Sequence, residues 1–71
     1  MLVVEAQELS NRIKIILNRA EDRTPESKEY IDGMREIVNQ ILRVIDESNR
    51  VTERQSTALK NLLQSLSRYI H

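Results

Sequence analysis

The fold of this chain depends on residues 46–57, which read DESNRVTERQST. Only Val51 is apolar in these twelve residues, which would form just over three helical turns, so no apolar stripe crosses them. Thr52 and Gln55 have the Thr-x-x-Gln spacing of a capping box, in which two side chains satisfy free amides at the start of a helix. We therefore expect one helix to end near residue 47 and another to span residues 52–70.

The same stretch also permits an unbroken helix. It contains no Gly and no Pro, and Asp46 and Arg50 are spaced to pair across one helical turn. The heptad frame of the preceding helix continues through it unshifted. The alternative is therefore one long helix over residues 25–70, with the N-terminal helix packed on its first half. That architecture would dimerise as a helical bundle, because the apolar stripe after residue 57 would otherwise be exposed.

The N-terminal segment has the pattern of an amphipathic helix over about residues 3–21. Its apolar residues are spaced 4, 3, 4, 3, 4. They are Leu2, Ala6, Leu9, Ile13, Ile16 and Ala20.

Thr24 and Pro25 mark the boundary that follows. Thr24 can accept an amide hydrogen bond as N-cap, and Pro25 suits the first helical position, where its missing donor is not needed. Proline also disfavours a helical conformation at the residue before it, so the first helix should end before Thr24. The second helix is predicted over about residues 25–47.

The second helix carries two adjacent apolar rows. One row contains Ile31, Met34, Val38, Ile41 and Ile45. The other contains Tyr30, Ile37 and Val44. Such a wide apolar face suits contact with two neighbouring helices. Gly33, inside this helix, costs about 1 kcal/mol relative to Ala; it either permits a bend or a close approach, or is simply tolerated.

Taken together, these patterns predict an all-α protein, a small three-helix bundle forming a single domain over residues 1–71. Its helices span about 3–21, 25–47 and 52–70. A core of this size is small and has no metal or disulfide to support it, which favours self-association.

The composition excludes several kinds of metal-binding and catalytic site. There are no cysteines, so disulfides and thiolate metal sites are excluded, and the single histidine is the terminal His71. One glycine cannot supply a phosphate-binding loop. The carboxylates fall on faces expected to be solvated, so we expect no catalytic, cofactor-binding or metal-binding residues and no small-molecule substrate. The protein is not expected to be an enzyme.

No localisation signal is visible. The apolar run that starts at Met1 ends at Glu5, which is too short for a secretory leader, and no stretch approaches the length of a membrane span. We expect a cytoplasmic protein with no membrane association.

The C-terminal helix carries the candidate partner-binding residues. Residues 1–47 have a net charge of −3 and residues 48–71 one of +3. We expect an apolar row to anchor a partner helix while three basic residues beside it set orientation. The anchors are Leu59, Leu62, Leu63, Leu66 and Ile70, and the basic residues are Arg54, Lys60 and Arg68.

The sequence thus favours a non-catalytic helical interaction module of the adaptor, chaperone or anti-activator type, binding a protein partner or a second copy as a homodimer. In size and pattern the chain is similar to small helical secretion chaperones and anti-activators. The alternative is a small DNA- or RNA-associated regulator that uses the basic C-terminal helix. Nucleic-acid binding is not the favoured interpretation, because few basic residues and no interleaved aromatic residues form that surface.

Overall fold

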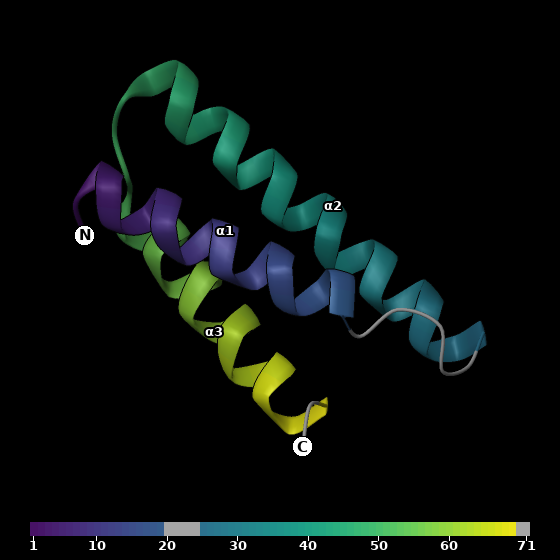
Figure 1. The fold of residues 1–71 in the computed structure, drawn as a ribbon. Coiled ribbons are helices and arrows are strands. Elements are labelled where there is room, and N and C mark those ends of the chain that lie inside the picture. The colour runs from purple at the N-terminus through teal and green to yellow at the C-terminus, as the bar shows by residue number, and fades with distance from the viewer. Residues whose placement is uncertain (20–24, 70–71) are drawn as a thin grey trace.

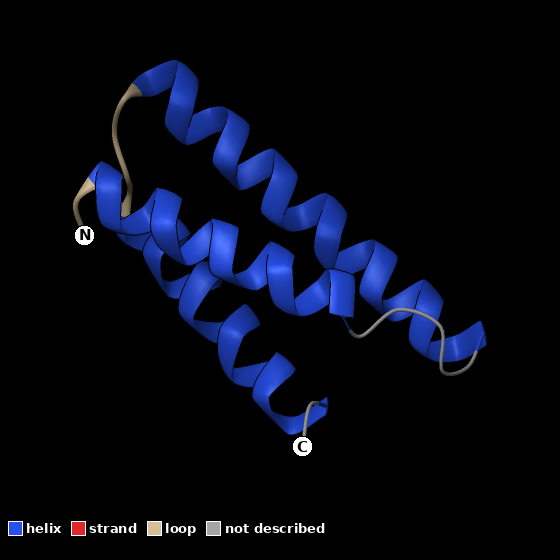
Figure 2. Ribbon diagram, in the orientation of Figure 1, coloured by secondary structure: helices blue, strands red, loops and turns tan. Residues whose placement is uncertain are grey.

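The structure is a computed structural model that describes residues 1–19 and 25–69. It contains three α-helices: α1 (Val3–Arg19), α2 (Pro25–Ser48) and α3 (Glu53–Tyr69). They pack as a small three-helix bundle in which consecutive helices run in opposite directions (Figures 1 and 2). In Figure 1, α2 and α3 lie on either side of α1. Each packs extensively on α1, and the two contact each other much less.

The boundary at Pro25 is confirmed. Pro25 is the first residue of α2, and Glu26 places a carboxylate in the first turn, where the helix dipole favours negative charge. The predicted N-cap Thr24 lies outside the described residues, as do residues 20 and 21, where the first helix was predicted to end. The last described residue of α1 is Arg19.

The alternative of one long helix over residues 25–70 is wrong, because the chain leaves the helical path at Asn49. Asn49 has a φ of 52°, in the left-handed region that Asn tolerates better than most residues. Its amide donates to the carbonyl of Ile45 at 2.7 Å, so the last turn of α2 is closed by a left-handed cap. The Ser48 hydroxyl lies 2.7 Å from the Val44 carbonyl and 3.2 Å from that of Arg50.

The predicted capping box begins α3. The amide of Thr52 donates to Oε1 of Gln55 at 2.8 Å, and the amide of Gln55 donates to Oγ1 of Thr52 at 3.1 Å. The amide of Ser56 donates to the Thr52 carbonyl at 3.0 Å, which starts the helical ladder. Thr52 and Gln55 therefore act as the sequence predicts.

All three helices contribute to one apolar core. The predicted row of α2 supplies more of its buried residues than either other helix, and Ile41 of the same row is partly buried. The buried apolar residues are Ala6, Ile13, Leu17, Ile31, Met34, Val38, Ile45, Leu59 and Leu66.

The core-facing row of α1 differs from the prediction. Leu2 precedes the helix and is 69% exposed, whereas the polar Ser10 is fully buried. The Ser10 hydroxyl is satisfied within its own helix, because it donates to the Ala6 carbonyl at 2.7 Å. Since α1 contacts two helices, its buried face is centred on Ala6, Ser10, Ile13 and Leu17, and Leu9 and Ile16 lie at its edge.

Candidate functional site

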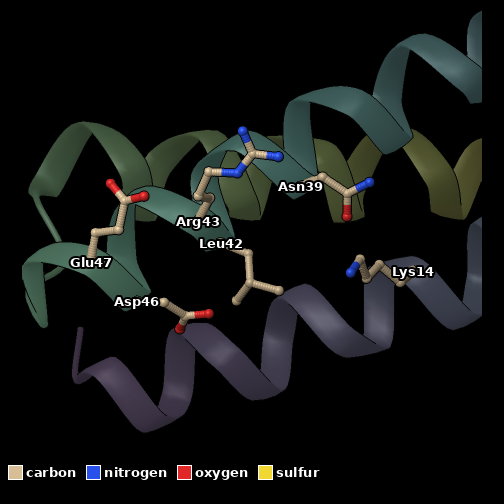
Figure 3. Close-up of a pocket in the computed structure, with 6 residues that line it drawn as sticks. All are labelled: Lys14, Asn39, Leu42, Arg43, Asp46 and Glu47. Atoms are coloured by element: carbon tan, nitrogen blue, oxygen red, sulfur yellow. The ribbon is translucent and has the colours of Figure 1, made fainter.

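A hollow of about 440 Å³ lies between α1 and α2. Its lining residues are Lys14, Asn39, Leu42, Arg43, Asp46 and Glu47 (Figure 3). In Figure 3, Leu42 and Asp46 point toward α1, whereas Arg43 and Glu47 extend away from it. Asp46 accepts a hydrogen bond from Nε2 of Gln7 at 2.9 Å, which ties α2 to α1.

This polar hollow has a lining of mixed charge. Two cationic side chains are offset by two carboxylates, so an anion entering it would meet repulsion as well as attraction. None of its lining residues is a serine, threonine or histidine that could pair with a base as nucleophile. We interpret it as part of the α1–α2 contact.

Within residues 1–19 and 25–69, no group of three or more His, Cys, Asp or Glu side chains could hold a metal ion. In the same residues no helix combines the length and apolar character that crossing a bilayer requires. The expectation that the protein has no cofactor and is not an enzyme stays a prediction.

A second hollow, between α2 and α3, is mainly apolar and has a volume of about 330 Å³. We call it the α2–α3 groove. It is lined by Tyr30, Met34 and Ile37 of α2 and by Ala58, Asn61, Leu62 and Ser65 of α3. The groove exists because both helices pack mainly on α1 and only lightly on each other.

Tyr30 and Ile37 line the groove and belong to the second apolar row of α2, which continues to Val44. Tyr30, Ile37 and Val44 are 44%, 47% and 47% exposed, although they are spaced seven residues apart on one face of the helix. The sequence predicts that this row contacts a second neighbouring helix. In the single chain, α3 leaves nearly half of each side chain uncovered.

The chain matches no protein-family model, no curated protein and no solved structure. The functional interpretation is therefore based on the surface of the described residues and on the charge distribution of the chain.

The predicted anchors on α3 are divided between the core and the surface. Leu59 and Leu66 are 0% and 1% exposed and belong to the core, so they offer no surface in this fold. Leu62 is partly buried and lines the α2–α3 groove. Leu63 is also partly buried and lines a smaller hollow of about 230 Å³ beside α1. Ile70 lies outside the described residues, and the partner-binding role of the whole set stays a prediction.

The predicted basic flank is also divided. Arg54 and Lys60 are exposed, but they lie six residues apart, which places them about 120° apart around a helix. They therefore do not form one basic row. The side chain of Arg68 lies outside the described part of the chain.

The helices that form the groove differ in charge. The sequence of α2 holds six acidic and three basic residues, whereas that of α3 holds one acidic and three basic residues. The sequence predicted that the exposed row of α2 contacts a neighbouring helix, but this row was not among the predicted partner-binding residues. The presence of two adjacent apolar rows on one helix was the signal that could have indicated it.

Proposed function

We propose that this protein is a non-catalytic helical interaction module that holds a partner helix on the α2–α3 groove. The observation that supports the proposal is the heptad row of Tyr30, Ile37 and Val44, each nearly half exposed, of which Tyr30 and Ile37 line an apolar hollow. Removing apolar side chains from water is favourable by roughly 25 cal/mol per Å² of buried area. Covering this row would therefore contribute favourably to the binding of a partner helix.

Recognition would follow the helix-in-groove mode. An amphipathic helix placed along the groove can contact Ile37 from one side and Leu62 from the other, while its polar face stays in water. The difference in net charge between α2 and α3 would favour one orientation of this helix, because like charges brought together oppose the other alignment.

Capture of bound proteins from an extract of the source cells, followed by mass spectrometry, tests this proposal. Tagged wild-type chain is compared with Ile37→Glu and with the matched control Ile15→Glu. Ile15 is 54% exposed on α1 and lines none of the three hollows described above. We expect the wild type and Ile15→Glu to retain the same partner, and Ile37→Glu to lose it while keeping its helical circular dichroism spectrum.

The proposal is wrong if the wild type neither retains a protein above a tag-only control nor pairs with a second copy of itself, or if Ile37→Glu retains the same proteins as the wild type. Because a charged side chain at a half-exposed position can still perturb folding, Ile37→Ser provides a milder second variant.

A further inference from the structure

We infer that the occupant of the α2–α3 groove is a second copy of this chain, with α2 of each copy lying on α3 of the other. The inference rests on the proposed function and names the partner for that same groove. Three properties of the described residues support it: the direction of the helices, their charges and the size of the face.

The helix directions suit a symmetric pair. Within one chain α2 and α3 run in opposite directions and form one open side of the bundle. A twofold rotation about an axis parallel to the helices brings two such sides together, with each α2 antiparallel to the partner's α3. The four helices then form a bundle core, and the two copies of α1 lie outside it.

The charges favour this pairing over the pairing of α2 with α2. The acidic α2 would meet the basic α3 of the other copy, and symmetry repeats this contact. An unrelated partner helix would need matching charges of its own, whereas a second copy carries them already. Placing α2 on α2 would instead bring together two helices that each carry six acidic and only three basic residues.

The open face has a suitable size. The molecule is 36 Å long and 17–20 Å across, so a side that runs along its length is of the same order as the ~800 Å² that each partner buries in a stable interface. Ile37 and its neighbours in the row would lie near the centre of that face, where anchors contribute most to affinity.

Sedimentation equilibrium over a wide concentration series tests the pairing. We expect the mass to rise from 8.3 kDa to twice that value with concentration. Ile37→Glu should weaken the dimer on the order of 100-fold, whereas Ile15→Glu should dimerise like the wild type. Added salt should also weaken the wild-type dimer, because it screens the attraction between α2 and α3.

Engineered cysteines test the arrangement, since the chain has none of its own. Ile37→Cys and Ala58→Cys each place one thiol in the groove, on α2 and α3 respectively. Under mild oxidation a mixture of the two variants should form a mixed disulfide dimer more readily than either variant links to itself. Preferential self-linking of Ile37→Cys would show α2 on α2 and overturn the proposed arrangement.

The outcomes separate this inference from the proposed function. A constant mass of 8.3 kDa overturns self-pairing, but Ile37-dependent capture of another protein would still support the interaction module. A dimer that Ile37→Glu leaves intact overturns self-pairing through the groove, because it must use another surface. Retention of the same proteins by Ile37→Glu and wild type overturns the proposed function whatever the mass.

Discussion

Replacing Gly33 by alanine should stabilise this protein. Gly33 lies inside α2 and is exposed, and its φ is not positive, so alanine can adopt its conformation. A Cβ atom added there meets nothing within 4 Å, so the methyl group clashes with nothing. The structure therefore shows neither the close approach nor the positive φ that would require glycine.

The magnitude follows from helix propensity. Glycine inside a helix is about 0.8–1.0 kcal/mol less favourable than alanine, chiefly because the unfolded chain loses more conformational freedom at glycine. With no steric loss to offset it, Gly33→Ala should raise the free energy of unfolding by about 1 kcal/mol. In a domain of this size that corresponds to a rise of about 4–8 °C in Tm.

Urea and thermal denaturation followed by circular dichroism measure this change. Both are carried out at one low protein concentration and repeated in the Ile37→Glu background, in which the groove is blocked. Gln40→Ala is the matched control, because it is exposed on the same helix and glutamine already has a high helix propensity. We expect the control to change stability by at most a few tenths of a kcal/mol.

An unchanged or lowered stability of Gly33→Ala in the Ile37→Glu background would refute this reasoning. It would mean that the backbone at Gly33 is bent or closely approached within the single chain. A gain that appears only in that background would instead place Gly33 inside an intermolecular contact.

Three further changes test the helix ends and the core. Thr52→Ala should destabilise the protein by about 1 kcal/mol in urea denaturation, since it removes one half of the capping box; Thr57→Ala, which removes a hydroxyl bonded to a carbonyl within α3, should not. Asn49→Ala should cost about 1 kcal/mol because alanine is strained at a φ of 52°, whereas Asn49→Gly should cost nothing; equal effects would contradict a left-handed cap. Leu59→Ala should cost about 2–5 kcal/mol and unfold much of the population near 37 °C, whereas the partly buried Leu62→Ala should cost clearly less; the reverse order would contradict this core.

Local chemistry made the helix boundaries predictable. Proline at the start of α2 and the pair Thr52 and Gln55 at the start of α3 act through their own backbone and near neighbours, so their roles follow from spacing alone. The end of α2 was less certain because it has no glycine. Asn49 supplies the left-handed conformation instead, and asparagine at this position was the overlooked sign that the helix ends.

The distribution of apolar residues between core and surface was less predictable. Periodicity shows that α2 has two apolar rows, but the positions of α1 and α3 decide that Val38 is buried while Ile37 stays half exposed. The same holds for α3, where Leu59 turns into the core and Leu62 lines the groove. Which apolar residues are buried depends on contacts between helices that are distant in sequence. The pattern of a single helix gives no information on those contacts.

The left-handed conformation of Asn49 at the end of α2 also directs α3 back onto the α1 of its own chain. If the backbone at Asn49 became helical, α3 would move away from its own α1 and could reach that of a neighbouring molecule, giving a domain-swapped dimer with the same core contacts. Each kcal/mol lost from this cap shifts the balance about fivefold toward the exchanged form. Selection on one hinge residue is therefore a simple route by which this sequence could evolve between a self-contained fold and an intertwined one.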